Sequence, residues 1–345
     1  MLWVVEAWRG LAALMVLWAH WGGALGWPMG PMAFAFTGVD LFFVLSGFVF
    51  APAILQRAPV SLAAYGLRRV TRIYPAYLAA LALYVALAWY AGKPLLYVPE
   101  HVLMAHVQSR EMAFYYNPVF WSLPAEVSFY VLVPALGWLL AGAAARQQKW
   151  RWAVVCVLAL GVRFGLLYSA DGAAQNLAYV LLSHLPGLLA EFLVGVGVWR
   201  HWQLQPQATA RSSALLGLAG LLGWLALAQL FGALQSASGT PDWRNGQLGL
   251  VAALCFAAML RASLSLPATH WGLWASQWGG RMSYAMYLLH MAWLTPAVMA
   301  SALWGTAAGT VLALAGLTVS CLALHWLVEE PARHWGRSLA RRWER

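Results

Sequence analysis

The chain has 345 residues, of which 62% are hydrophobic and only 9% are charged, and its mean hydropathy is +0.66. A soluble fold could not hide that much apolar surface, so the composition predicts an all-α integral membrane protein. The formal net charge of +10 does not predict a nucleic-acid partner. The positive residues lie in short loops between apolar stretches, not among stacking aromatics on a soluble domain.

Ten apolar stretches have about the length needed to cross a bilayer. They cover residues 3–24, 33–56, 74–92, 119–142, 152–170, 177–199, 213–234, 247–260, 282–301 and 308–328. Alternate loops carry nearly all of the lysines and arginines, so the positive-inside rule places both termini in the cytoplasm. We expect one domain over 1–345, multi-pass in the cytoplasmic (inner) membrane. The stretch 247–260 is short, and the linker 261–281 could re-enter the membrane.

The first stretch carries two ionisable residues on one helical face. Arg9 and His20 are 11 residues apart, which on an α-helix places them within roughly 20° of each other and about 16 Å apart along the axis. Ionisable side chains in an apolar span are costly and usually face a bundle interior or a water-filled cavity. We therefore predict that this helix forms one wall of a reaction chamber.

Two carboxylates are expected near the level of His20. With this topology, His20 lies near the outer end of its span, and Asp40 and Glu126 lie about two turns below the outer ends of theirs. A histidine and two carboxylates at one level suit general acid–base chemistry, because a carboxylate can orient an imidazole. The alternative is a set of ordinary hydrogen bonds between helices.

Weaker candidates follow in later spans. Arg163 and His184 fall in the outer halves of their spans, and Glu191, two turns after His184, could pair with a basic group. A polar stripe at i, i+4 and i+7 marks the ninth span: Ser283, Tyr287 and His290. Each of these residues could contact substrate or serve only in helix packing.

No metal site is expected. His101 and His106, in the outer segment 93–118, lack metal-ligand spacing to a nearby acid and are expected to be solvated loop residues. Three cysteines lie in or beside apolar stretches without CxxC spacing and are expected to be inert: Cys156, Cys255 and Cys321.

A compact basic cluster precedes the third stretch. Arg68, Arg69 and Arg72 stand just ahead of Tyr74. Such a cluster could hold the phosphates of a large anionic cofactor through charge-assisted hydrogen bonds. Ordinary positive-inside topology with binding of lipid headgroups explains it equally well.

Other reaction classes lack their motifs. Ser46 follows Asp40 by six residues, about 240° round one helix, and no GxSxG turn is present, which argues against a Ser–His–Asp hydrolase. The sequence also has no Walker A loop and no GxGxxG, so nothing points to ATP or a dinucleotide.

Six blocks in order along the chain resemble the membrane-bound acyltransferase-3 family. The pattern Arg9-x10-His20 matches the family's opening signature. The later blocks are GVDLFFVLSGF (38–48), RRVTRIYP (68–75), WSLPAEVSFY (121–130), SYAMYLLH (283–290) and EEPAR (329–333). Together they span nearly the whole chain.

The resemblance implies transfer of an acyl group, usually acetyl, from cytoplasmic acetyl-CoA to a hydroxyl of a carbohydrate or related acceptor outside. It makes the residues that match Arg9 and His20 essential, with Glu126 in a block linked to activity. His20 would deprotonate the acceptor, oriented by Asp40 or Glu126. The expected donor-binding residues are Arg9, Arg68, Arg69, Arg72 and Tyr74, and the expected substrate contacts are Trp121, Ser122, Arg163, Tyr287 and His290.

Family members often carry an appended extracellular hydrolase-like domain. The sequence shows none before it stops at Arg345, so any such step is expected to need a separate extracytoplasmic partner or to be unnecessary. The acceptor stays open among a surface polysaccharide, a lipid-linked sugar and a small molecule, and membrane lipids are expected partners. The second reading is a transporter of an acyl donor or acylated product with a proton relay, and the third is a non-catalytic scaffold.

Overall fold

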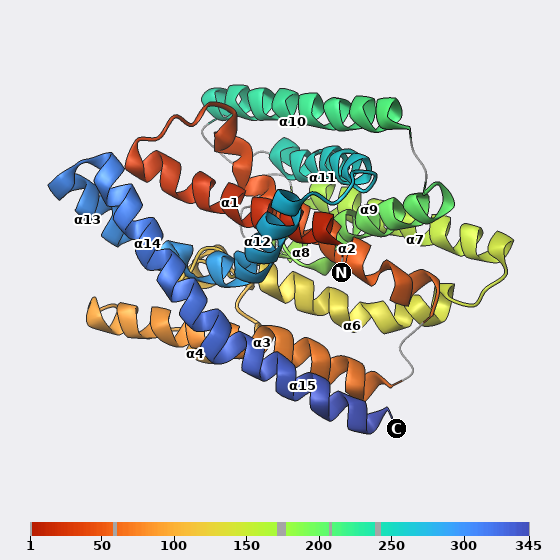
Figure 1. Ribbon diagram of the computed structural model, residues 1–345, viewed down its shortest axis with the longest axis horizontal. Coiled ribbons are helices and arrows are strands. Elements are labelled where there is room, and N and C mark those ends of the chain that lie inside the picture. The colour runs from red at the N-terminus through yellow and green to blue at the C-terminus, as the bar shows by residue number, and fades with distance from the viewer. Residues whose placement is uncertain (1, 58–60, 171–176, 207–208, 239–242, 345) are drawn as a thin grey trace.

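The computed structural model describes residues 2–57, 61–170, 177–206, 209–238 and 243–344. Within these residues every regular element is a helix, and there is no strand. The predicted all-α class is therefore confirmed. Figure 1 shows α1, α2 and α12 in the middle of the bundle, α10 along one edge, and α3 beside α15 along the opposite edge.

The elements that build the centre come from both halves of the chain. The first half contains α1 (Trp3–Leu25), the 3-10 helix η1 (Gly30–Thr37), α2 (Gly38–Leu55), α3 (Leu62–Tyr90), α4 (Val98–Val102), α5 (Arg110–Ala113), α6 (Ser122–Leu140) and α7 (Ala145–Ser169). The second half contains α8 (Leu177–Leu182), α9 (Leu185–Leu204), α10 (Ala210–Ser238), α11 (Trp243–Ser263), α12 (His270–Leu289), η2 (His290–Trp293), α13 (Leu294–Trp304), α14 (Thr306–Leu324), η3 (His325–Glu329) and α15 (Glu330–Trp343).

Each of the ten predicted spans falls on helical structure, and eight of the ten lie in helices that meet the length and hydropathy expected of a membrane span. In the described residues, eight helical stretches are long and apolar enough to cross a membrane, and α11 adds a shorter apolar segment, Leu248–Ser263. The first helix, α1, is not among the eight. It carries Glu6, Arg9 and His20, and it packs against α12 and α2 inside the bundle. The region 261–281, expected to be a linker, is largely helical because α12 begins at His270.

Helix α1 can approach α12 closely because glycines face each other at the contact. A Cβ added at Gly10 would lie 2.8 Å from the Cα atom of Gly279. Real Cβ atoms do not come so near, so only glycine allows this spacing. The contact fixes the Arg9 face of α1 against the part of α12 that carries the SYAMYLLH block.

Helix α12 ends just before His290, and side chains from distant segments bind its last carbonyls. The hydroxyl of Tyr84 and the amide of Asn117 each donate to the carbonyl of Leu288 at 3.0 Å, and the Trp21 indole donates to that of His290 at 3.0 Å. The last carbonyls of a helix have no partner within the helix. These bonds therefore stabilise the break between α12 and α13 inside an apolar bundle.

The segment between α3 and α6 is folded into the bundle, so the expectation of solvated His101 and His106 was wrong. Both side chains are fully buried, and their rings stack with centroids 4.3 Å apart. The carbonyl of His101 accepts from Tyr77 at 2.6 Å, and His106 Nε2 lies 3.2 Å from the carbonyl of Phe120. Alternation of polar and apolar residues could not reveal this burial, because the partners come from α3 and the start of α6.

Burial of this pair predicts a pH-dependent stability. Burial, together with the nearby His101, lowers the pKa of His106 from 6.5 to about 4. Above about pH 6.5 the ring is neutral in the folded and unfolded chains alike, so its contribution is fully present there. Between pH 6.5 and 4 only the unfolded chain takes up the proton, and the free energy of unfolding should fall by at most about 3 kcal/mol.

Thermal unfolding of detergent-solubilised protein at pH 7.5 and pH 5 measures this effect. The His106→Asn variant should lose less stability between these two values than the unaltered protein does. An equal loss in both proteins would contradict the assignment to His106.

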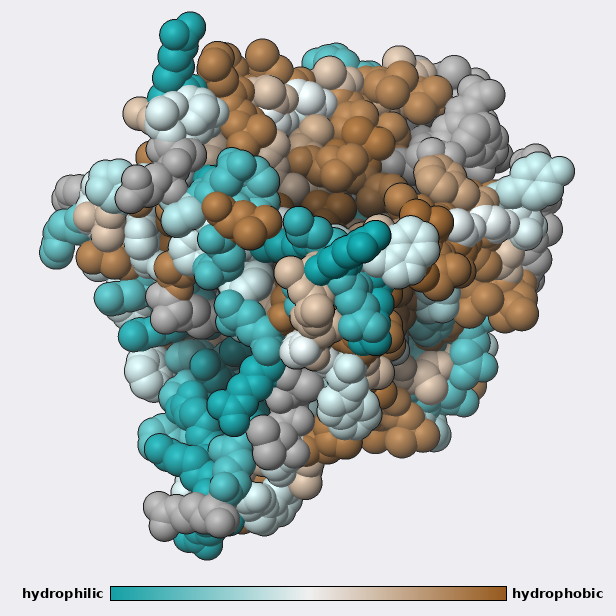
Figure 2. Space-filling model, turned by 90° about the vertical axis from the view of Figure 1, so that its right-hand side faces the viewer, coloured by the Kyte–Doolittle hydropathy of each residue, from teal (hydrophilic) through white to brown (hydrophobic). Residues whose placement is uncertain are grey.

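At one end of the molecule α15 lies along α3. Gly336 packs against Thr71, and Arg68 of α3 donates to Glu344 at 2.6 Å. Figure 2 views the molecule from this end: hydrophilic side chains gather in a band down one side, and apolar side chains cover much of the upper part.

Candidate active site

A cavity of about 470 Å³ lies between the N-terminal half of α1, the first half of α12 and the η3–α15 junction, with Arg72 of α3 in its wall. Its lining is strongly charged, which is unusual inside an apolar bundle. The charged residues that line it are Glu6, Arg9, Arg72, Arg281, Glu329, Glu330 and Arg333. Trp3 and Trp326 add aromatic walls.

A second, much smaller cavity of about 40 Å³ continues the first toward the interior. Five residues line both cavities: Arg9, Arg72, Ser283, Tyr284 and Glu329. At its inner end stand Phe42, Ser122, Glu126 and Tyr287. We refer to the two cavities together as the chamber. Its inner part holds no more than a few waters, so an acyl group can pass farther only when side chains at this end move.

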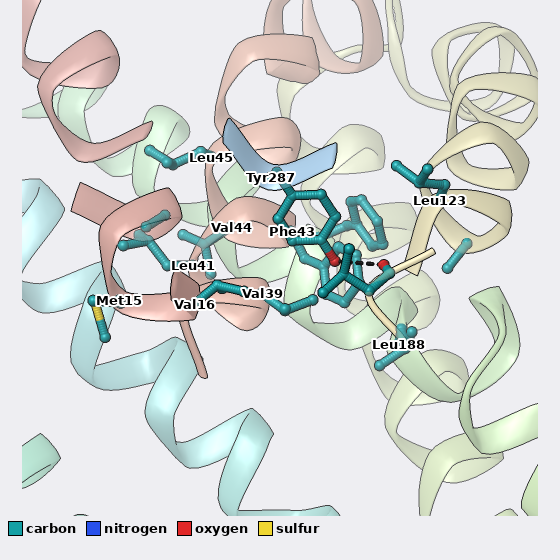
Figure 3. Close-up of a cluster of buried hydrophobic side chains, with 14 of the residues drawn as sticks. Met15, Val16, Val39, Leu41, Phe43, Val44, Leu45, Leu123, Leu188 and Tyr287 are labelled. Atoms are coloured by element: carbon teal, nitrogen blue, oxygen red, sulfur yellow. Dashed lines mark hydrogen bonds between the residues drawn. The ribbon is translucent and has the colours of Figure 1, made fainter. Parts of the chain in front are cut away.

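Tyr287 and Ser122 close the inner end. Their hydroxyl groups lie 2.6 Å apart, and Tyr287 also donates to the carbonyl of Val119 at 2.8 Å. Figure 3 shows Tyr287 reaching into the buried apolar cluster near Phe43 and Leu123, with a dashed line at its hydroxyl. The ring of Phe42 packs against that of Tyr287, with centroids 5.6 Å apart.

The cations of the chamber differ in how far they are neutralised. Arg9 lies 3.8 Å from Glu6, and Arg333 lies 3.5 Å from Glu329. Within the described ranges no carboxylate oxygen lies within 4.0 Å of the Arg72 guanidinium. A cation in the wall of a partly enclosed cavity without an anion is a site where a ligand anion is stabilised.

The π-helix η3 contributes a second group of ionisable side chains. His325 Nδ1 lies 3.0 Å from Glu329, and Arg333 lies 3.3 Å from Glu330, all within the lining of the chamber. A single π-turn inside an α-helix is frequently found at functional sites. The EEPAR block marked this region in the sequence, but no pattern there indicated that it faces Arg9.

Glu126 occupies the chamber, not the surroundings of His20. It accepts hydrogen bonds from Ser46 Oγ at 3.1 Å and from the Tyr130 hydroxyl. It lines the small cavity together with Arg9, which lies about 16 Å below His20 along α1. Glu126 therefore shares a cavity with Arg9, and within the described residues it forms no hydrogen bond with His20.

His20 contacts another histidine. Its Nδ1 lies 2.8 Å from the carbonyl of Val16 and 3.4 Å from Nε2 of His290. A carbonyl only accepts, so in the neutral ring Nδ1 carries the hydrogen and Nε2 keeps a free lone pair; this tautomer follows from the partners. His290 is held likewise, with Nδ1 3.0 Å from the carbonyls of Met286 and Tyr287. Its own Nε2 lone pair thus faces the Nδ1–H of His20.

No carboxylate in the part of the chain that the structure describes forms a hydrogen bond with His20. The expectation that Asp40 or Glu126 orients His20 is therefore not met. The polar stripe of Ser283, Tyr287 and His290 does face the site: Ser283 and Tyr287 line the chamber, and His290 joins the chamber's inner end to His20.

Asp40 belongs to a separate buried cluster. Arg163 donates to Glu191 at 2.8 Å and to the carbonyl of Gly187 at 2.7 Å, and the carboxyl groups of Asp40 and Glu191 lie side by side against Gly249. The predicted pairing of Glu191 with a basic group is confirmed. Arg163, expected to contact substrate, faces this cluster and not the chamber.

The arginine cluster is divided between three surroundings. Arg72 lines the chamber, Arg68 pairs with Glu344, and Arg69 lies among the rings of Phe50, Tyr65 and Tyr130. All three belong to α3, where Arg69 points about 100° away from Arg68. Arg68 and Arg72 are one turn apart and point nearly the same way, and the ion pair with Glu344 keeps Arg68 out of the chamber. Tyr74 lines the same pocket as Arg69, separate from the large cavity of the chamber. Trp121 packs edge-on against Phe43 beside the chamber.

Sequence reasoning missed several residues of the chamber. Tyr130, Tyr284 and Arg281 line it without having been singled out. Tyr130 and Tyr284 stand in blocks already noted for family resemblance, four residues after Glu126 and one after Ser283. That proximity was the available signal. For Arg281 only its place at the end of a loop was visible.

Within the described residues no group of three or more histidine, cysteine, aspartate or glutamate side chains is placed to hold a metal ion. All three cysteines are free thiols. Arginines, carboxylates and tyrosines line the chamber, and the pair of His20 and His290 lies beyond its inner end.

Comparison with known proteins identifies the family of the chain. The acyltransferase-3 family profile, described as an "Acyltransferase domain", matches residues 3–330. The peptidoglycan O-acetyltransferase OatA of Listeria monocytogenes is 27% identical over 316 residues, which cover 83% of this chain and 48% of that protein. The chain therefore spans about half the length of this relative. No solved structure matches the present chain. Because the profile covers nearly the whole chain, the protein belongs to the acyltransferase-3 family.

Proposed function

We propose that the protein transfers an acetyl group from acetyl-CoA, bound from the cytoplasmic side, to a hydroxyl of a cell-envelope carbohydrate. One observation carries the proposal most directly. A charged cavity of about 470 Å³ contains Arg9, and the free lone pair of His20 lies on the same face of the same helix about 16 Å farther in. An anionic donor whose phosphates are held at Arg9 can thus present its thioester end to His20.

The donor phosphates would be held in the larger cavity of the chamber, the one of about 470 Å³. Arg72 has no carboxylate partner there, and Arg9 and Arg333 could exchange long contacts with glutamates for bonds to phosphate. Arginine forms such charge-assisted bonds in a planar, often bidentate geometry. Trp3 and Trp326 offer flat faces for the base of the nucleotide.

His20 would act as the general base at the inner end. Nε2 takes the proton of the acceptor hydroxyl while the hydroxyl oxygen attacks the thioester carbonyl. The carbon–sulfur bond breaks, and the sulfur leaves with the proton from His20 as the free CoA thiol. Val16 and His290 hold Nδ1 on the opposite side of the ring, so Nε2 keeps its direction throughout the step.

The acceptor is proposed from the relative. The Listeria protein is named for O-acetylation of peptidoglycan, and a hydroxyl of a polymer outside the membrane is compatible with a base near the far end of α1. A lipid-linked sugar has the same hydroxyl chemistry. Tyr287 and Ser122, hydrogen-bonded between the chamber and the histidine pair, would have to separate for the acyl group to reach His20.

A mass-spectrometric assay tests the proposal. Purified protein in liposomes receives acetyl-CoA and a panel of glycans, including peptidoglycan fragments. Release of CoA with an acetylated glycan is the expected result. Failure of the folded protein to bind acetyl-CoA would overturn it and favour the transporter reading.

The divided arginine cluster gives a matched pair of variants for the donor site. Arg72→Gln should weaken acetyl-CoA binding by about 10- to 150-fold, because hydrogen bonds to charged groups contribute about 1.5–3 kcal/mol. Arg68→Gln, one turn away on the same helix but paired with Glu344, should change binding less than about twofold. Calorimetric titration of both variants measures the difference. Equal weakening would show that the donor spans both positions.

A further inference from the structure

A groove on the outside of the bundle lies between α3 and α6, and the chamber function does not use it. Its volume is about 320 Å³, within the range of ligand pockets. Its rims carry exposed apolar side chains, among them Val70 (52% exposed), Val131 (75%) and Trp138 (60%). In a membrane protein such a face is turned toward lipid chains.

One positive charge lies in this apolar groove without an anion. Arg69 lines it, and its guanidinium carbon lies 5.0 Å from the ring centroid of Phe50 and less than 6 Å from those of Tyr65 and Tyr130. Its buried Nε has no hydrogen-bond partner. Neighbouring Arg68, in contrast, is paired with Glu344.

The surrounding rings only partly compensate this charge. Cation–π contacts contribute about 0.5–2 kcal/mol, less than a buried cation needs when it leaves water. Within the described residues no carboxylate oxygen lies within 4.0 Å of Arg69. A ligand that brings an anion into the groove would pair with this charge.

The position of Arg69 fits the headgroup of a lipid. It stands seven residues after the start of α3, about 10 Å along the axis, and the groove also contains Trp138, two residues before the end of α6. Tryptophan favours the membrane–water boundary, where a long arginine side chain can reach phosphate. The rest of the lining is mainly carbon, which suits one acyl chain and offers no second cation for a diphosphate.

We propose that this groove binds one anionic glycerophospholipid, with its phosphate on Arg69 and an acyl chain along α3 and α6. The wall behind the lipid is thin, because Ile73 and Tyr130 line both the groove and the chamber. Tyr130 also donates a hydrogen bond to Glu126. The lipid thus supports one wall of the chamber from outside, and Arg69 serves the lipid and not the donor. The proposal does not rest on the acetyl-transfer reaction.

Glycines on the lipid-facing surface supply a clean test. A Cβ at Gly66, in the groove, meets no atom within 4 Å, so Gly66→Leu fills the groove without displacing the helices. Gly161 on α7 is equally open but lies outside the groove. Gly161→Leu is therefore the matched control, and Arg69→Gln removes the charge.

Native mass spectrometry of detergent-purified protein with phosphatidylglycerol or with diacylglycerol, which has the same acyl chains but no phosphate, measures the binding. The unaltered protein and Gly161→Leu should retain one phosphatidylglycerol at least about tenfold more tightly than diacylglycerol, as expected for a charge-assisted hydrogen bond to the phosphate. Arg69→Gln should lose this preference, and Gly66→Leu should lose the bound lipid. Melting temperatures without added lipid identify any variant that fails to fold. If Arg69→Gln fails to fold, the comparison of Gly66→Leu with Gly161→Leu still tests the proposal.

Three results would each overturn the proposal. The first is equal retention of both lipids by the unaltered protein. The second is retention of the lipid by Gly66→Leu at the level of Gly161→Leu. The third is tighter retention of a polyprenyl phosphate than of phosphatidylglycerol, which would assign the groove to another lipid.

Discussion

Replacement of His20 by alanine should lower acetyl transfer by about 10²- to 10⁴-fold, the usual contribution of a positioned general base. The reason is specific to this site. Nδ1 is held by the Val16 carbonyl and by His290, so Nε2 is the only ring atom free to take a proton. Acetyl-CoA should still bind, because the chamber's arginines lie about three helical turns away.

The measurement is turnover by mass spectrometry with acetyl-CoA binding followed in parallel. His290→Asn is the informative companion, since it removes the second ring beside His20 but leaves the proposed base. It should reduce turnover less than His20→Ala and shift the pH dependence of the rate, because His290 acts by positioning His20. Normal transfer by folded His20→Ala protein would show that the proposed mechanism is wrong.

Arg163→Met should destabilise the protein by about 3–5 kcal/mol, the usual cost of removing one partner from a buried ion pair. Arg163 and Glu191 have side chains only 4% and 0% exposed, and the carboxyl group of Asp40 lies beside that of Glu191. Without the guanidinium, two acidic groups stay buried with no cation.

Thermal unfolding in detergent checks this prediction, and a double variant serves as its control. Arg163→Met combined with Glu191→Leu removes both charges and should recover a large part of the lost stability. If Arg163→Met keeps normal stability yet loses transfer, the arginine contacts substrate, as the sequence first indicated. A stable, active variant would leave the cluster without either role.

Local periodicity was enough to predict much of this protein. Composition gave the membrane class, and helical spacing placed Arg9 and His20 on one face and Ser283, Tyr287 and His290 on another. Both stripes do face the interior, because the rotation between residues of one helix is fixed by the backbone. The same rule turns Arg69 about 100° away from Arg68, whereas Arg68, on nearly the same side as Arg72, is taken up by Glu344.

Only the tertiary structure decided which helices meet. It placed Asp40 against Glu191 and Arg163, Glu126 against Arg9, and His20 against His290. It also buried His101 and His106 in a segment that reads as a loop. Contacts between helices depend on packing, such as the glycine approach of α1 to α12, between residues hundreds of positions apart. A single sequence determines which residues share one face of each helix. The packing of the helices determines which other face each of these faces contacts.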